Sequence, residues 1–220
     1  MTRILTLSIL CLAATLAGAQ DKPKVELPKA DADGWISLFN GKDLTGWKAN
    51  ESPESFKVED GKIVVNGKRS HLFYVGDVKG HVFKNFEFKA EVLIKPNSNS
   101  GIYFHTEWQD KDWPAKGFEC QVCAAGYKDP RKTGSLYAIK DLAESPVKED
   151  EWFEYHILVK GKKVEIRLAG KSVNEWTQPD DFTAKQFKGR ILDKGTFALQ
   201  GHDPGSTVWY KNLRVKALED

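Results

Sequence analysis

The chain has 220 residues, with 33 Lys and Arg against 31 Asp and Glu and a formal net charge of +2. This length is enough for one domain with a full hydrophobic core. Because the two signs of charge are balanced and interspersed, the composition argues against nucleic acid or an anionic membrane as the main partner.

The first 19 residues have the pattern of a secretory signal peptide. Arg3 precedes an apolar run over residues 4–16, and small residues follow at positions 17–19. The apolar run is too short to span a bilayer comfortably. We therefore expect cleavage near Ala19, a secreted or periplasmic protein, and no membrane attachment after cleavage.

The rest of the chain is predicted to be a flexible leader followed by one all-β domain. Residues 20–33 are charged and contain proline, which favours a flexible leader, and residues 34–218 are expected to form a single domain. Apolar residues in the domain alternate with polar ones in short runs between turn residues, with no sustained 3.6-residue period. The expected strands lie in residues 56–59, 62–65, 71–76, 85–95, 99–107, 118–122, 135–139, 152–176 (a three-strand meander), 195–200 and 207–218. Short strands at this spacing indicate an all-β sandwich or barrel.

The stretch from Asn99 to Gln121 carries polar residues on one face of two expected strands. Side chains alternate along a strand, so Tyr103 shares a face with His105 and Glu107, while Ile102, Phe104 and Thr106 take the other. In the next strand, Glu119 and Gln121 lie opposite Phe118, Cys120 and Val122. Two such neighbouring strands would bury one face and present a polar surface on the other.

Two cysteines remain after loss of the signal peptide, and they are not expected to form a disulfide. Cys120 and Cys123 lie in a strand-like run. Strand positions three apart are separated by about 10 Å at ~3.3 Å per residue, beyond the reach of a disulfide. We expect Cys120 to be a core residue and Cys123 an unpaired thiol, and no second C-x-x-C motif completes a zinc site.

Six motifs follow one another in the order and spacing of a known family. They are W-x-x-L-F-N-G-K-D-L-x-G-W (35–47), N-S-G-I-Y-F (99–104), G-F-E-x-Q (117–121), T-G-S-L-Y (133–137), E-W-F-E-Y-x-I-x-x-K-G (151–161) and L-Q-G-H…V-W-Y-K-N-L-R-V (199–215). The chain resembles the secreted bacterial 3-keto-disaccharide hydrolase family over residues 34–218. The resemblance implies a concanavalin-like jelly roll, in which two curved antiparallel sheets form a sandwich and the concave face binds sugar.

The resemblance also implies a reaction. Glycosides oxidised at C3 of the sugar are cleaved by elimination followed by hydration. A ketone at C3 acidifies the C2 proton, so the site needs a base, an acid for the leaving group and a donor for the developing enolate oxygen. One position departs from the family pattern: His105 stands where the family commonly has Arg, so substrate specificity does not carry over directly.

Three residues are candidates for the catalytic roles: Glu119, His105 and His202. Histidine suits the base by its pKa and a partly desolvated Glu suits the acid. His202 lies in a polar loop, where function often resides. Two of them have a structural alternative: Glu119 can be a solvent-facing strand carboxylate, and His105 can simply pair with Glu107 without any role in a site.

Further residues are candidates for substrate contacts. Aromatic side chains can stack on sugar rings, but they can also pack in the core. The connection over residues 125–151 is long enough to be functional. The substrate-binding candidates are Tyr103, Gln121, Trp113, Tyr137, Glu107, Arg131, Lys140 and His71.

No cofactor or catalytic metal is indicated, and the expected partner is a carbohydrate substrate. A structural calcium ion has no motif to support it, although the acidic loops at Asp110/Asp112 or Asp180/Asp181 would permit one. Two other functions stay open. One is a non-catalytic carbohydrate-binding module. The other is an ordinary glycosidase, which needs two carboxylates, whereas this strand pairs Glu119 with an amide at Gln121.

Overall fold

The structure is a computed structural model that describes residues 28–220. It contains thirteen strands and two short 3-10 turns, η1 (Pro53–Ser55) and η2 (Val78–His81). The strands are β1 (Ile36–Ser37), β2 (Trp47–Ala49), β3 (Phe56–Glu59), β4 (Lys62–Val65), β5 (Ser70–Tyr74), β6 (Phe86–Ile94), β7 (Asn99–Thr106), β8 (Phe118–Cys123), β9 (Phe153–Lys160), β10 (Lys163–Leu168), β11 (Lys171–Thr177), β12 (Thr196–Gly201) and β13 (Val208–Ala217). No helix within residues 28–220 is long and apolar enough to cross a membrane.

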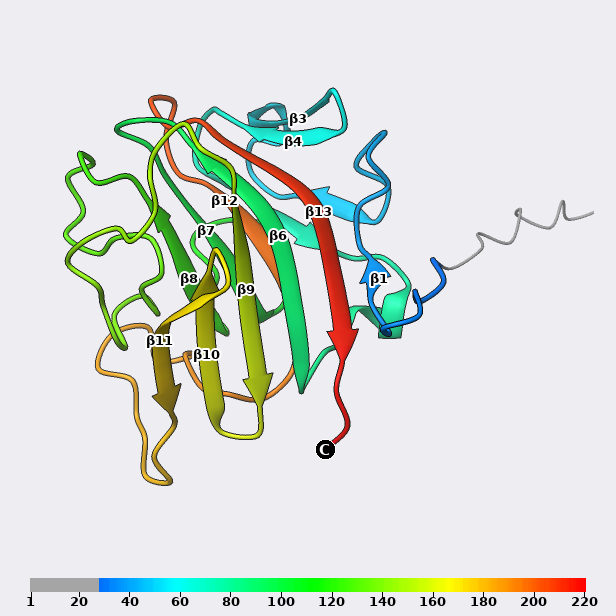
Figure 1. Cartoon of the computed structure of the whole chain (residues 1–220), viewed down its shortest axis with the longest axis vertical. Coiled ribbons are helices and arrows are strands. Elements are labelled where there is room, and N and C mark those ends of the chain that lie inside the picture. The colour runs from blue at the N-terminus through cyan, green and yellow to red at the C-terminus, as the bar shows by residue number, and fades with distance from the viewer. Residues whose placement is uncertain (1–27) are drawn as a thin grey trace, which may run out of the picture.

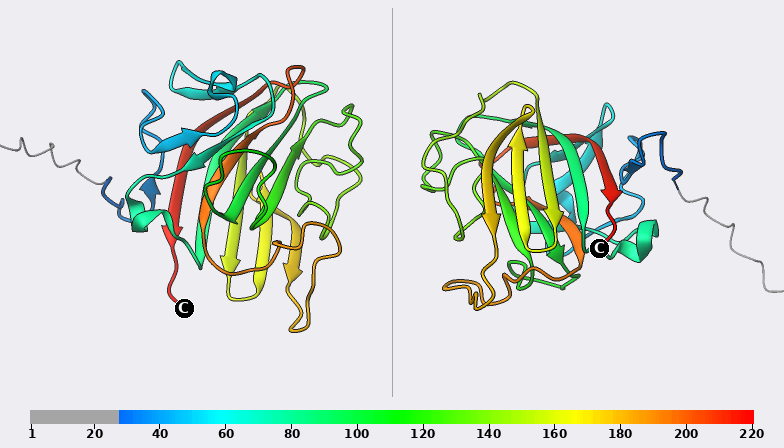
Figure 2. Two further views of the ribbon diagram at one scale, coloured as in Figure 1. Left: turned by 180° about the vertical axis from the view of Figure 1, so that it is seen from behind. Right: turned by 60° about the horizontal axis from the view of Figure 1, so that its bottom comes forward.

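The strands form two antiparallel sheets that pack as a sandwich (Figure 1). The larger sheet has the order β11-β10-β9-β6-β13-β4-β3, with β1 beside β13, and the smaller has the order β2-β5-β12-β7-β8. Seen from behind in Figure 2, β7 and β8 lie in front of the larger sheet. The predicted all-β sandwich of two antiparallel sheets is confirmed, and so is the three-strand meander, which forms β9 to β11.

Aromatic residues from both sheets fill the space between them. Phe86 and Phe88 of β6 point inward and contact Phe197 of β12, with ring centroids 4.9 and 4.7 Å apart. Phe104 of β7 stacks on Phe118 of β8 at 5.4 Å. All five rings are fully buried, and burial of each contributes roughly 1.5–3 kcal/mol to the free energy of folding. This packing fixes which side chains of the smaller sheet face outward.

Candidate active site

A row of polar side chains crosses the outer face of the smaller sheet. Tyr103 of β7 pairs with Glu119 of β8, and Gln121 lies two residues further along the same strand. On the other side of β7, Gln200 of β12 pairs with His71 of β5. The prediction that Glu119 and Gln121 share a face opposite the core is confirmed, because Cys120 and Val122 lie in the core.

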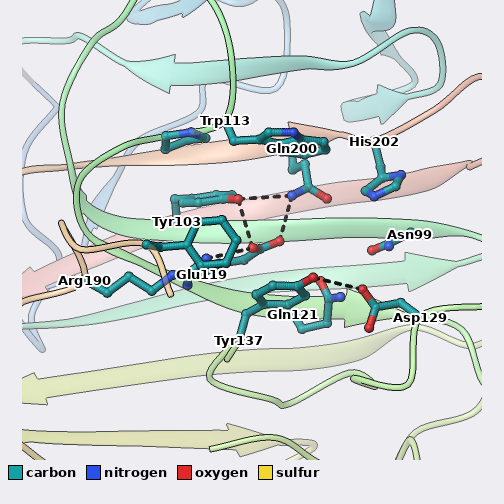
Figure 3. Close-up of a pocket in the computed structure, with 12 residues that line it drawn as sticks. Asn99, Tyr103, Trp113, Glu119, Gln121, Asp129, Tyr137, Arg190, Gln200 and His202 are labelled. Carbon is teal, nitrogen blue, oxygen red and sulfur yellow. Dashed lines mark hydrogen bonds and ion pairs between the residues drawn. The ribbon is translucent and has the colours of Figure 1, made fainter. Parts of the chain in front are cut away.

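Four of these side chains, Tyr103, Glu119, Gln121 and Gln200, form one wall of a cavity of about 250 Å³. Loops before and after β8 and before and after β12 supply the other walls. Figure 3 draws the lining residues as sticks around the hollow and labels most of them. The full set is Asn99, Tyr103, Trp113, Pro114, Glu119, Gln121, Asp129, Tyr137, Phe187, Arg190, Gln200 and His202.

Glu119 is the buried centre of this cavity, with 3% of its surface exposed. Tyr103 Oη donates a hydrogen bond to its Oε2 at 2.9 Å, and Gln200 Nε2 donates to its Oε1 at 2.7 Å. Arg190 Nη2 lies 3.5 Å from Oε2. Burial raises the pKa of the Glu119 carboxyl, and the Arg190 charge and the two hydrogen bonds oppose that rise. The result is a desolvated carboxyl group that three donors hold in one orientation.

Gly101 gives the Glu119 side chain the space it needs. The two residues lie on adjacent strands, and a Cβ at position 101 would stand 2.6 Å from Glu119 Oε1. Any larger residue would therefore displace the carboxylate.

His202 lies at the other side of the cavity and forms a pair with a carboxylate. Its Nδ1 is 2.9 Å from Asp203 Oδ2, and Tyr127 Oη donates to the same oxygen at 2.9 Å. Ser206 Oγ donates to Asp203 as well. Since Nδ1 is engaged with Asp203, the Nε2 atom is the one left for a ligand. Three-quarters of the His202 side chain is buried.

The connection after β8 supplies Tyr137 and Asp129. Tyr137 Oη donates to Asp129 Oδ2 at 3.1 Å, and both residues line the cavity. Arg131 does not line it. Its Nε donates to Asp141, and its guanidinium lies 4.6 Å from the centre of the Tyr137 ring, which it supports from behind.

The strand expected at residues 135–139 is wrong, although this segment does pair with β8. Its bridges to other segments are isolated ones at Leu136 and do not extend into a ladder. Backbone hydrogen bonds nevertheless join Gln121 N to Ser135 O, and Tyr137 N to Glu119 O. The connection thus covers the free edge of β8 with an irregular segment, and by doing so it brings Tyr137 over the cavity.

Trp113 and His71 are in contact at the upper wall. Trp113 lines the cavity, and its ring lies 5.3 Å from His202 and 5.4 Å from His71. His71 is fully buried beneath it and does not line the cavity. Burial lowers the pKa of His71 to about 3, so the ring is neutral at neutral pH.

The expected position of His105 beside Tyr103 is wrong. The residue has φ +54°, which breaks the strand alternation. Its ring packs on Phe86 and Phe104 instead, Nε2 contacts Lys84 O at 2.9 Å, and Nδ1 accepts from Asp193 N. Burial lowers the pKa of His105 to about 4. The structure therefore places His105 outside the cavity.

Two other candidates also lie elsewhere. Glu107 is exposed and faces Lys116, with 3.6 Å between the charged atoms. Lys140 donates from Nζ to Glu175 O at 2.8 Å on the larger sheet's edge. Neither side chain lines the cavity.

Sequence reasoning missed several lining residues. Gln200 had a usable signal, because it alternates with the core residue Leu199 in an expected strand. Arg190 and Phe187 had none, since they lie in an irregular segment between β11 and β12. Asn99, Pro114 and Asp129 were also missed.

Several buried polar atoms around the cavity have no hydrogen-bond partner among the described residues. They are Asn99 Oδ1, Gln121 Oε1, Gln200 Oε1, and Nε and Nη1 of Arg190. Buried polar groups are normally paired, and leaving one unpaired costs about 1–3 kcal/mol. All four residues line the same cavity, which indicates a site for a polar ligand that both donates and accepts hydrogen bonds.

The cysteine predictions agree with the structure. Cys120 is part of the core, and Cys123 is a buried free thiol. Within residues 28–220, no three His, Cys, Asp or Glu side chains gather closely enough to hold a metal ion, and this includes the acidic loops at Asp110/Asp112 and Asp180/Asp181.

Comparison with known proteins places the chain in a family. A 3-keto-disaccharide hydrolase of Bacteroides thetaiotaomicron is 27% identical over 246 residues, which cover 91% of this chain and 84% of that protein. The crystal structure of a provisionally named glycosyl hydrolase from Parabacteroides distasonis has a TM-score of 0.72 and 28% identity, and the match covers 86% of this chain and 95% of that one. A carbohydrate-binding module of Bacillus subtilis, CBM66, shares the fold at 16% identity and a TM-score of 0.50, over 84% of this chain and 96% of that one. Residues 34–216 match the 3-keto-alpha-glucoside-1,2-lyase-like domain, and the chain therefore belongs to that family.

Proposed function

We propose that this protein cleaves glycosides whose sugar ring is oxidised at C3, by elimination and then hydration. The observation that carries the proposal is the set of buried polar atoms that have no partner among the described residues and belong to side chains lining one cavity with Glu119 and His202. Family membership and the named relatives support the same chemistry. Ligand pockets commonly measure roughly 300–1,000 Å³, so a cavity of about 250 Å³ suits one sugar ring with the rest of the substrate outside.

The geometry favours Glu119 as the base, which reverses the roles expected from the sequence, where a histidine was the base and a Glu the acid. Its carboxylate is held by Tyr103, Gln200 and Arg190, and all three act as donors. Burial raises the pKa of Glu119, which makes the carboxylate a stronger base than a solvated one. The carboxylate takes the C2 proton, and the electron pair of the C2–H bond forms an enolate with its charge on the C3 oxygen.

His202 is suited to be the acid for the leaving group. Asp203 lies 2.9 Å from Nδ1 and holds the ring in place, which leaves Nε2 free to pass a proton to the leaving oxygen. When the enolate collapses, the C3 carbonyl re-forms, a C1=C2 double bond forms and the C1–O bond breaks. The leaving oxygen takes a proton from His202. In the hydration step, water adds its oxygen to C1, His202 accepts the water proton, and Glu119 returns a proton to C2.

The test is a reaction in D₂O with 3-keto-trehalose or 3-keto-lactose, followed by NMR. Elimination and hydration release free sugar, and they place deuterium at C2 of the 3-keto product when the Glu119 carboxyl exchanges its proton with D₂O before it returns one to C2. The free 3-keto sugar incubated with the protein measures exchange that occurs without cleavage. Absence of turnover on every 3-keto glycoside, with retained binding of intact glycans, would instead identify a binding module.

One observation favours a second candidate, an ordinary two-carboxylate glycosidase. Asp129 lines the same cavity as Glu119, so a second carboxylate is present after all. This function predicts hydrolysis of unoxidised p-nitrophenyl glycosides, loss of that activity in Asp129→Asn, and a product without deuterium at C2.

We also propose that the protein is exported, from the signal-peptide pattern in residues 1–19. Those residues lie outside the described part of the chain. N-terminal sequencing of the mature protein should find Gln20 first; a chain that retains Met1 in the cytoplasm would contradict export.

A further inference from the structure

Arg190 is a buried cation whose charge is only partly compensated. It is 4% exposed, and its one charged partner within residues 28–220 is Glu119, at 3.5 Å from Nη2. Nε and Nη1 have no partner among the described residues. A guanidinium stays protonated at any ordinary pH, and burying a charge without full pairing is costly. Such a group is expected to be completed by a ligand.

The backbone around Arg190 fixes the side chain in place. Arg190 N donates to Phe187 O at 2.9 Å, and Gly117 N donates to Gly189 O at 3.0 Å. Gly189 is packed so closely that a Cβ there would lie 1.9 Å from Ala115 O. The segment is therefore pinned to the loop before β8, and the guanidinium does not depend on a mobile loop for its position.

Aromatic rings position the guanidinium further. Its Cζ lies 4.5 Å from the centre of the Phe187 ring and 5.3 Å from that of Tyr137. These contacts orient the cation, but they offer no acceptor oxygen to its N–H groups. Figure 3 shows Arg190 beside Glu119 at one side of the cavity, with His202 at the other.

We propose that Arg190 binds the oxo oxygen of the oxidised sugar and stabilises the enolate that forms there, which selects oxidised over unoxidised rings. The inference rests on the proposed function. C2 and C3 are neighbours in the ring, so a base at C2 and a donor at the C3 oxygen must also be neighbours, as Glu119 and Arg190 are. The leaving group at C1 then points toward His202. Donors placed where charge develops are worth about 10²–10³ in rate.

The experiment isolates proton abstraction from cleavage. The probe is the 3-keto derivative of 1,5-anhydroglucitol, which has no leaving group at C1, and the readout is C2–H exchange in D₂O by NMR. The wild-type protein should catalyse the exchange. Exchange rates are measured as a function of pH. Arg190→Gln should lower the maximum rate of C2–H exchange, reached at the high-pH plateau, about 10²–10³-fold. The Kd of unoxidised 1,5-anhydroglucitol should change less than threefold. Arg190→Lys should recover part of the rate, and guanidinium at low millimolar concentration should rescue Arg190→Ala.

Controls separate this role from a general effect of removing an arginine and from an indirect effect through Glu119. Arg214→Gln removes an arginine of the larger sheet that is paired with Glu154, and it should leave the exchange rate within twofold of wild type. If Arg190 acts only by changing the proton affinity of Glu119, Arg190→Gln will shift the pH midpoint of the exchange rate and leave its maximum unchanged. That result overturns the proposal. Exchange by Arg190→Gln within threefold of wild type also overturns it. Circular dichroism and the thermal midpoint of unfolding establish that each variant is folded. If Arg190→Gln does not fold, Arg190→Lys takes its place in the comparison.

The two proposals fail in different ways. If the wild-type protein neither exchanges the C2 proton nor cleaves a 3-keto glycoside, the proposed function is wrong. If the wild-type protein does both and Arg190→Gln does them equally well, only the role of Arg190 is wrong.

Discussion

At the scale of single residues, the site depends on a carboxyl group whose surroundings give it an unusual proton affinity. Glu119 is buried and held by Tyr103 and Gln200. Alternation along β8 was sufficient to place Glu119 and Gln121 on the outer face. The same reasoning failed for His105, because a residue with positive φ ends the alternation, and sequence alone does not reveal that change.

Glu119→Gln should abolish most of the activity while preserving the fold. The amide has the same shape but cannot accept the C2 proton, so kcat on a 3-keto disaccharide should fall about 10²–10⁴-fold. The affinity for the unoxidised disaccharide should change little. Steady-state kinetics and calorimetric titration check the two quantities. An unchanged kcat would exclude Glu119 as the base.

His202→Asn should be sensitive to the leaving group. A 3-keto disaccharide expels an alkoxide that needs a proton, so its kcat should fall about 10²-fold or more. A p-nitrophenyl 3-keto glucoside expels a stable phenolate, and its rate should stay within a few-fold of wild type. Equal losses on both substrates would contradict the role of His202 as the acid.

At the scale of elements, strands and loops contribute to the cavity in different ways. The strands β7, β8 and β12 fix Tyr103, Glu119 and Gln200 through register, and their periodicity made most of these strands predictable. The walls come from irregular segments with no period to detect. This is why Arg190 was missed, and why the segment at 135–139 was mistaken for a strand.

Gly101→Ala tests the contact between β7 and β8. The added methyl group would meet Glu119 Oε1 at 2.6 Å, so we expect loss of stability by about 1–3 kcal/mol and a fall in kcat of tenfold or more as the carboxylate shifts. Gly201→Ala in β12 is the matched control, because its methyl group would meet nothing closer than 3.4 Å. Activity equal to wild type in Gly101→Ala would mean that Glu119 tolerates displacement.

At the scale of the whole molecule, burial of His71 and His105 makes the stability of the fold depend on pH. The folded-state pKa is about 3 for His71 and about 4 for His105, and burial is the main cause in both. An unfolded histidine titrates near 6.5. Between these values the unfolded chain binds more protons, so stability falls as the pH falls from 6.5 towards 4. The raised pKa of Glu119 acts in the opposite direction and offsets part of this loss.

His71→Phe should remove part of that pH dependence. Neither ring nitrogen of His71 has a partner among the described residues, so an apolar ring of similar shape loses no hydrogen bond. At pH 8 the variant should be within about 1 kcal/mol of wild type, and at pH 5 more stable by about 2 kcal/mol. Urea unfolding at several pH values measures this difference. The exposed His81→Asn should keep the wild-type dependence; the same dependence in His71→Phe would contradict the prediction.

The two buried thiols of β8 have a practical consequence. Cys120 directly follows Glu119, and Cys123 ends the strand; burial raises the pKa of Cys123 to about 12. An alkylating reagent modifies thiolates, and it reaches these sulfur atoms only after β8 separates from its neighbours. The rate of alkylation therefore reports how often the strand that carries Glu119 opens. A bound sugar ring that holds the strand closed will lower the alkylation rate. The two natural cysteines therefore report ligand binding without an engineered probe.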